Sequence, residues 1–147
     1  SVLIRPGIKN MILRIAEKYK VGIYSSTSYH NLTKIIEGIF GARHPFLFVA
    51  DRKTTQLDPR YGTDPSIRNF DTIKTLECIW RHPIFNVDRV WNSNNTLLVD
   101  HDIKKVEEND SKNVLIVPEF TLDIYLTSMH PVSELESMIE EKFQQMN

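Results

Sequence analysis

The sequence predicts an α/β fold, in which helices cover both faces of a parallel sheet. Short apolar runs alternate along the chain with longer segments whose apolar residues recur at helical spacing. The apolar runs are too uniformly apolar to be strands with one solvated face. One of them, residues 96–99, ends abruptly in acidic residues, which is typical of a strand at the ligand-binding edge of an open α/β sheet.

The bulk composition predicts one globular domain spanning residues 1–147. Residues are 41% hydrophobic and 25% charged, and the net charge of -1 argues against a surface that binds nucleic acid through bulk positive charge. The single cysteine, Cys78, excludes an internal disulfide and a multi-cysteine metal site, which fits a reducing compartment. No apolar run is long enough to cross a membrane. We therefore expect an intracellular protein, nuclear or cytoplasmic before mitochondrial.

The first half of the chain alternates helix and strand twice. Apolar residues at helical spacing predict an amphipathic helix over 8–19, and a short strand follows over 21–24. The next helix carries its apolar face over 32–40 and ends at Gly41, a typical C-cap. A second, fully apolar strand is expected over 46–50.

A long irregular segment opens the second half. Residues 51–70 are rich in Asp, Arg, Pro, Thr and Gly, show no periodicity and are predicted to form one long loop, a feature more often functional than idle. A third helix is predicted over 73–80, capped by Asp71 or Thr72, which places Lys74 in its first turn.

The rest of the chain returns to alternation. The acidic-ended strand over 96–99 precedes a short charged helix over 103–108 and a fourth strand over 114–117. Residues 121–129 fit a helix or an extended chain equally. An amphipathic C-terminal helix is predicted over 131–146.

Two features place polar groups where an anion could bind. The hydroxyl cluster Ser25-Ser26-Thr27-Ser28 follows the first strand, where hydroxyls and free helix N–H groups converge, although a Ser-rich helix cap explains the same pattern. Lys74 in the first turn of a helix is mildly disfavoured by the helix dipole, which a nearby anion would offset. A solvated surface lysine is the alternative.

Several segments also occur in the order and spacing of one family. They are Arg5-Pro6-Gly7, Val21-Gly22-Ile23-Tyr24-Ser25-Ser26, Ile73-Lys74-Thr75-Leu76 with Ile79-Trp80, Ser93-Asn94-Asn95-Thr96-Leu97-Leu98-Val99-Asp100, and Val117-Pro118-Glu119-Phe120. With these segments the chain resembles, over residues 3–125, the phosphatase-like domain of the RNA polymerase II C-terminal-domain phosphatases. That domain belongs to the haloacid dehalogenase superfamily.

The resemblance implies a three-layer Rossmann-like sheet of the haloacid dehalogenase type. It also implies a magnesium-dependent phosphoryl transfer through an aspartyl-phosphate, with phosphoserine or phosphothreonine in proteins as the substrate. Carried over by position, Ser25, together with Ser26, binds the phosphoryl oxygens, and Lys74 neutralises their charge. Asp100, or less readily Asp102, binds Mg²⁺. Phosphoryl transfer depends on positioned cations and donors around a spread negative charge, which agrees with these residue types.

The sequence departs from the family pattern at two places. His101 stands where relatives have a second acid, and a neutral imidazole is a poor ligand for Mg²⁺. The Asp-x-Asp nucleophile motif, expected before Arg5, is not in this chain. We therefore expect an upstream segment, a partner chain or Val2-Leu3-Ile4 to fill the central strand position. Asp100-His101-Asp102 itself has the motif's spacing, but Lys104 follows where Thr or Val is expected, and too little chain remains for the other motifs.

Two functions follow as alternatives. The first is a phosphatase domain that is N-terminally incomplete, and therefore inactive as this chain alone, because its nucleophile comes from outside it. The second is an inactive scaffold or binding subunit, a role that some relatives have in the mitochondrial inner-membrane import machinery. The expected partners are a phosphoprotein or peptide and the segment that completes the sheet. The loop over 51–70 would read such a peptide, or it is simply solvated.

Overall fold

A computed structural model describes residues 7–119 and 132–146 of the chain. The helices are α1 (Ile8–Lys18), α2 (Tyr29–Phe40), α3 (Leu76–Trp80), α4 (Ile103–Val106) and α6 (Val132–Met146), with short 3-10 turns η1 (Arg52–Thr54) and η2 (Ser111–Asn113). The strands are β1 (Ile23–Tyr24), β2 (Val49–Ala50), β3 (Gln56–Leu57), β4 (Thr72–Ile73), β5 (Leu98–Asp100) and β6 (Val114–Ile116).

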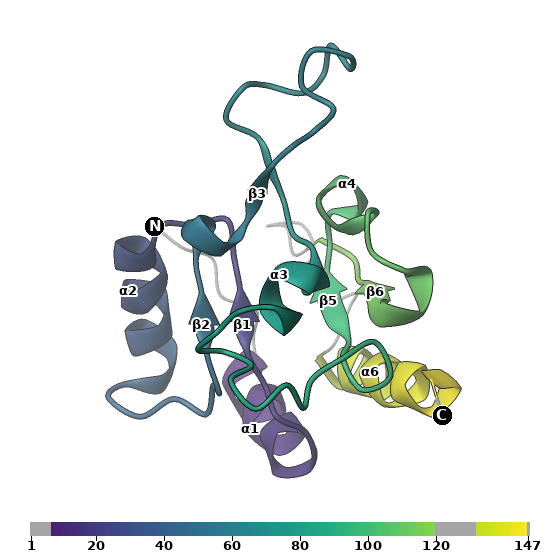
Figure 1. The fold of residues 1–147 in the computed structure, drawn as a ribbon. Coiled ribbons are helices and arrows are strands. Elements are labelled where there is room, and N and C mark those ends of the chain that lie inside the picture. The colour runs from purple at the N-terminus through teal and green to yellow at the C-terminus, as the bar shows by residue number, and fades with distance from the viewer. Residues whose placement is uncertain (1–6, 120–131, 147) are drawn as a thin grey trace.

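The described strands form two parallel pairs and one antiparallel pair. β1 pairs with β2, with Ile23 opposite Val49, and β5 pairs with β6, with Leu98 opposite Val114. β3 and β4 pair in antiparallel fashion. Figure 1 shows β1, β2, β5 and β6 running in one direction, so that their carboxyl ends share the edge from which β3 and β4 rise. The α/β class predicted from the sequence is therefore confirmed.

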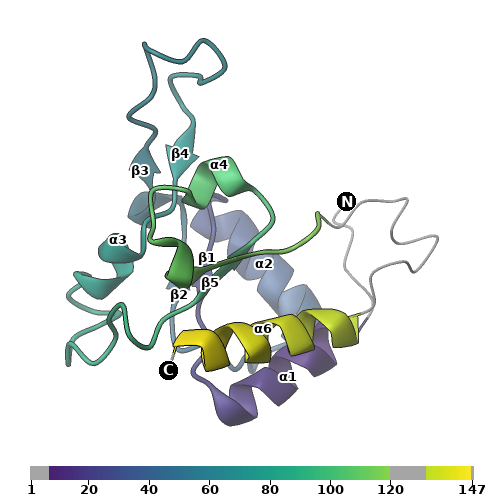
Figure 2. The same cartoon turned by 90° about the vertical axis from the view of Figure 1, so that its right-hand side faces the viewer.

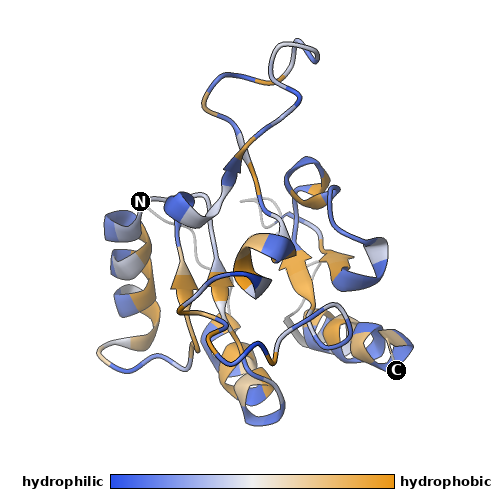
Figure 3. Cartoon of the chain, viewed as in Figure 1, coloured by the Kyte–Doolittle hydropathy of each residue, from blue (hydrophilic) through white to orange (hydrophobic). Residues whose placement is uncertain are grey.

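Helices lie on both faces of the parallel strands. α3 lies on one face, and α1, α2 and α6 lie on the other (Figures 1 and 2). Figure 3 shows the parallel strands as strongly apolar, and the helices carry an apolar stripe on one side. Three buried clusters form the core: Met11, Ile15, Leu135 and Ile139; Leu32, Ile36, Phe40 and Phe46; and Leu76, Leu98 and Val106.

The helix boundaries follow from local chemistry. α2 begins where the Ser28 side chain accepts a hydrogen bond from Asn31 N, and ends at Gly41, whose φ of 70° suits a residue without a Cβ. α1 and α6 pack their apolar faces together and add two ion pairs at their rims, Arg14 with Glu136 and Lys18 with Glu140.

The third helix begins later than predicted. Residues Thr72–Ile73 are strand β4, and α3 starts at Leu76, so Lys74 precedes the helix instead of lying in its first turn. Backbone hydrogen bonds to other segments explain the difference, because Lys74 N donates to Lys105 O and Leu76 N donates to the Asn109 side chain. The spacing of apolar residues in the sequence gives no information about such tertiary hydrogen bonds.

The segment predicted as one loop, 51–70, also contains regular structure. It includes η1 and strand β3, which pairs with β4 beyond the segment's end. Residues 121–129 and Val2-Leu3-Ile4 lie outside the described residues. Within the described part of the chain, no helix has the length and apolar character needed to cross a membrane.

Candidate active site

Two of the predicted site residues meet at the carboxyl edge of the parallel strands. Asp100 ends β5, and Lys74 lies between β4 and α3. The Lys74 ammonium donates to Asp100 Oδ2 over 2.6 Å, and the two side chains are only 13% and 6% exposed. Removing one partner of such a buried pair leaves an uncompensated charge, which is strongly unfavourable. These two residues are called the Lys74–Asp100 corner below.

The turn after β5 fixes the second oxygen of Asp100. Its Oδ1 accepts hydrogen bonds from His101 N at 2.7 Å and from Asp102 N at 3.0 Å. Asp102 in turn caps α4, because its Oδ1 accepts from Lys104 N at 3.1 Å. The alternative metal ligand named from the sequence is therefore a helix cap, and α4 starts directly from the corner.

The electrostatics of the corner favour an ionised carboxylate. Burial by itself raises the pKa of Asp100, but the hydrogen bond from Lys74 and those from the Asp102 and His101 backbones outweigh it, so the pKa lies below its usual value. At neutral pH the corner therefore holds a carboxylate and an ammonium side by side. An ammonium held at the edge of a parallel sheet is suited to a phosphoryl group.

The hydroxyl cluster lies on the same edge but in the other strand pair. Ser25 follows β1, its backbone N donates to Ala50 O, and its Oγ accepts from Thr27 N at 3.1 Å. Ser26 is next to it and half-buried, while Ser28 is the cap of α2. Among the described residues no hydrogen bond joins Ser25 to the Lys74–Asp100 corner. The helix cap that the sequence offered as an alternative is Ser28. Ser25 and Ser26 lie at the end of the strand, where the anion site was expected.

The described residues do not by themselves form a Mg²⁺ site. His101 is half exposed, with Nδ1 at 3.7 Å from Asp100 Oδ1 and Nε2 at 4.0 Å from Glu119 Oε1. In residues 7–119 and 132–146, no three Asp, Glu, His or Cys side chains gather closely enough to hold a metal ion. Mg²⁺ demands several oxygen ligands in octahedral geometry, more than the Asp100 carboxylate can supply by itself.

A hairpin arm, residues 55–73, rises from this edge (Figure 1). Arg60 attaches the arm to the corner's neighbour α4: its Nη2 donates to Lys104 O at 2.7 Å, and its Nη1 pairs with Glu107. The same guanidinium binds the buried Asp58 of the arm at 2.7 Å. The arm is therefore attached to the α4 segment, and it exposes the large apolar side chains Leu57, Tyr61 and Phe70.

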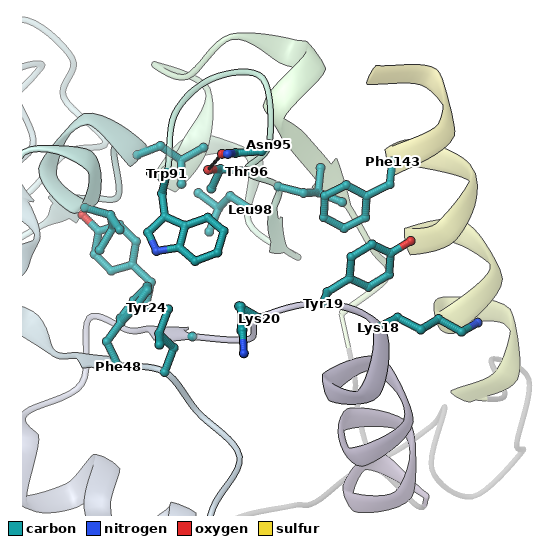
Figure 4. A pocket seen from close by; sticks show the side chains of 15 residues that line it. Lys18, Tyr19, Lys20, Tyr24, Phe48, Trp91, Asn95, Thr96, Leu98 and Phe143 are labelled. Atoms are coloured by element: carbon teal, nitrogen blue, oxygen red, sulfur yellow. Dashed lines mark hydrogen bonds between the residues drawn. The ribbon is translucent and has the colours of Figure 1, made fainter. Parts of the chain in front are cut away.

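Two cavities of about 330 Å³ each separate the two parallel pairs. Both are lined by Tyr24 of β1, by Gly22 just before it, and by Leu97 and Leu98 of the β5 segment. One extends toward α3 and the other toward α1 and α6. Figure 4 looks into the first, with Tyr24, Phe48 and Trp91 on one side and the stacked rings of Tyr19 and Phe143 on the other.

Neither of these cavities is lined by Lys74, Asp100 or Ser25. Their linings are mainly apolar, which does not suit a phosphate. They lie instead between the segments 21–24 and 96–99, the position at which the family resemblance predicts a central strand. Within the described residues nothing fills this position, and the options named from the sequence lie outside those residues, so that expectation stays a prediction.

The fold and the Lys74–Asp100 corner define the class of protein: an α/β domain with a buried ion pair at the carboxyl edge of its parallel strands. The family model of the NLI interacting factor-like phosphatases matches residues 1–144, and the chain belongs to this family. It is also similar to an uncharacterized FCP1 homology domain-containing protein of Schizosaccharomyces pombe, with 23% identity over 115 residues. That match covers 76% of this chain and 46% of the relative. The resemblance inferred from the sequence is thus confirmed.

Sequence reasoning missed two side chains that organise this edge. Asn109 bonds to the backbone on both sides of Thr75, next to Lys74. The Tyr24 hydroxyl lies 3.2 Å from Thr75 O and 3.3 Å from Thr54 O. Neither residue carries a signal of this role in the sequence, because each acts on segments far away in the chain.

Proposed function

We propose that the chain is the larger part of a phosphatase domain that hydrolyses phosphoserine or phosphothreonine in proteins. The observation that carries the proposal is the buried Lys74–Asp100 pair, held at 2.6 Å at the carboxyl edge of parallel strands in a member of a phosphatase family. Lys74 would neutralise the charge of the phosphoryl oxygens, and the hydroxyls of Ser25 and Ser26 would donate to them.

The nucleophile in this proposal is an aspartate on a strand that lies between β1 and β5. Its carboxylate attacks phosphorus, the bond from phosphorus to the serine or threonine oxygen breaks, and water then hydrolyses the acyl phosphate to release inorganic phosphate. Mg²⁺ would supply charge neutralisation when bound. Asp100 is the described residue that would hold it, with further ligands from outside the described residues.

The two cavities support the strand position. A strand inserted between β1 and β5 would face α1 and α6 on one side and α3 on the other, so it should be apolar on both faces. Ile23 N and Ser25 N donate to the β2 segment, so the alternate amide of Tyr24 is directed toward the inserted strand. Its end would then lie at the edge that carries the corner.

Activity is tested on a longer protein that includes the strand and its Asp-x-Asp motif. It should hydrolyse p-nitrophenyl phosphate with Mg²⁺, and Lys74→Ala and Asp100→Asn should each lower that activity by about 100-fold or more. Lys34→Ala, on the exposed face of α2, is the matched control and should leave the rate unchanged. The 147-residue chain alone should be inactive. Full activity in both corner variants would overturn the site assignment.

The inserted strand has its own test, which does not require catalysis. Hydrogen exchange at the Tyr24 amide should be fast in the 147-residue chain and slow in the longer protein, because a new strand would bond to it. Equal exchange rates in the two proteins would overturn the proposed position of the strand.

An inactive scaffold is the second candidate, and His101 favours it. This imidazole replaces the acid that relatives carry beside Asp100, which weakens any site for Mg²⁺. A His101→Asp variant of the longer protein separates the two functions. If the chain descends from an enzyme that lost its metal ligand, the variant should bind Mg²⁺ and gain hydrolysis, whereas an active parent with little change in the variant favours the phosphatase.

A further inference from the structure

The side chain of Asn109 makes three hydrogen bonds that converge on the segment carrying Lys74. Its Oδ1 accepts from Leu76 N at 2.7 Å. Its Nδ2 donates to Lys74 O at 2.8 Å and to Val106 O at 2.8 Å. One carboxamide therefore bonds to the backbone on both sides of Thr75 and to the end of α4.

These bonds connect Lys74 to the structural unit that also holds Asp100. α4 starts from the turn that fixes the Asp100 carboxylate, and Lys105 O of α4 accepts from Lys74 N at 2.7 Å. Val106 is fully buried against Leu76 and Leu98, so α4 cannot shift without opening that cluster. The backbone of Lys74 and the turn that carries Asp100 are thus both connected to α4.

We propose that Asn109 is a positioning residue that holds Lys74 at the phosphoryl site by fixing the backbone on both sides of Thr75. This inference rests on the proposed function, because it assigns Asn109 to the reaction through Lys74 and not through contact with the substrate. Lys74 has a long flexible side chain, and its ammonium is useful in phosphoryl transfer only when its origin is fixed.

A simpler role would be a cap for α3, since Thr75 makes no side-chain cap bond to the helix. Asn109→Asp separates the two roles. The carboxylate keeps the oxygen that accepts from Leu76 N but loses the N–H groups that donate to Lys74 O and Val106 O. If Asn109 is only a cap, the variant should behave like the parent; if it positions Lys74, the variant should behave like Asn109→Ala.

Asn113→Ala is the matched control. Asn113 is also a buried carboxamide near α4, and its Nδ2 donates to two backbone carbonyls, Ser93 O and Thr96 O, in the segment that leads into β5. Its loss should lower stability through bonds of the same kind without reaching Lys74. Comparison with Asn109→Ala therefore separates a general loss of stability from a local loss of position.

The first measurement needs no catalysis and uses the 147-residue chain. The rate at which a small amine-acylating reagent labels each lysine is followed by peptide mass spectrometry, with exposed Lys34 as the internal reference. Asn109→Ala and Asn109→Asp should both raise labelling of Lys74 toward that of Lys34, and Asn113→Ala should not. The proposal is overturned if Asn109→Asp labels like the parent, or if Asn113→Ala raises Lys74 labelling as much as Asn109→Ala does.

The second measurement uses the longer, active protein. Asn109→Ala and Asn109→Asp should lower kcat about 10- to 100-fold and leave KM within about twofold, because a displaced charge affects the transition state more than binding. Equal kcat values in parent and variants would overturn the role in catalysis. If the longer parent is itself inactive, the proposed function fails, while the labelling result still decides whether Asn109 holds Lys74.

Discussion

The two parallel strand pairs differ in how firmly the groups at their carboxyl ends are held. After β5, the Asp100 carboxylate has three hydrogen-bond donors, and Lys74 is bonded through both its side chain and its backbone. After β1, the Ser25 hydroxyl accepts from Thr27 N, and the cluster then becomes the cap of α2. The charged half of the candidate site, Lys74 and Asp100, is thus held in place by several hydrogen bonds within the fold. The hydroxyl half, Ser25 and Ser26, is held by local turn bonds.

A partly buried tyrosine, Tyr24, connects the Ser25 side to the Lys74–Asp100 corner. Tyr24 extends from β1, and its hydroxyl lies within hydrogen-bond distance of carbonyls before the arm and before α3. Burial raises the pKa of Tyr24 well above its usual value, so the phenol stays protonated and able to donate. The Tyr24 hydroxyl therefore connects the strand that leads into Ser25 with Thr75, the residue after Lys74.

The largest expected effect contrasts the two halves directly. In the longer protein, Lys74→Ala should lower kcat about 10²- to 10³-fold, because an electrostatic contact to developing charge is lost. Ser25→Ala should lower it only about 10-fold, since a neighbouring hydroxyl or backbone N–H can replace the donor. Steady-state kinetics with an aryl phosphate measure both. If Ser25→Ala lowers kcat as much as Lys74→Ala does, the Ser25 hydroxyl is positioned as firmly as the Lys74 ammonium.

A second prediction concerns stability on the β1 side. A Cβ on Gly22 would overlap the Phe48 ring, which stacks on Phe85 at 4.9 Å, so Gly22→Ala should destabilise the fold by about 1–3 kcal/mol. Gly38→Ala is the control, because Gly38 lies in α2 with open space around it; that change should stabilise by about 1 kcal/mol. Urea denaturation measures both, and two shifts of the same sign would contradict the packing argument.

Much of the β1 and β2 side could be predicted from the sequence, because the evidence is local. Apolar runs located the strands, and Gly41 located the end of α2. The corner was reachable only through the family resemblance, since Lys74 and Asp100 are far apart in the chain. The late start of α3 and the role of Asn109 were not predictable, because tertiary hydrogen bonds decide them and leave no periodic pattern.

A third prediction removes the link between the halves. Tyr24→Phe should cost about 1 kcal/mol of stability, the net contribution of one hydrogen bond, while the ring keeps its packing. We also expect a small loss of kcat in the longer protein, and the Tyr24→Phe, Ser25→Ala double variant should lose less than the two single losses combined, because Tyr24 would act through the Ser25 hydroxyl. Additive losses in this double-mutant cycle would mean that Tyr24 does not position Ser25.

The smallest effect is expected at the arm, where acid should break the ion pair between Arg60 and Asp58. The hydrogen bond from Arg60 lowers the pKa of Asp58 below its ordinary value of 3.8, against the opposing effect of burial. This contribution to stability is therefore complete above pH 3.8 and is lost as the pH falls through the lower, folded-state pKa.

Amide exchange in residues 58–71, compared between pH 6 and pH 3 after correction for the intrinsic rate, should show the arm loosening before the core does. Arg60→Met should produce the same loosening at neutral pH. Arg68→Met, which removes an exposed ion pair within the arm, should not. If the arm and the core lose protection together in acid, the arm is part of the core's cooperative unit. It could then not move independently of the Lys74–Asp100 corner.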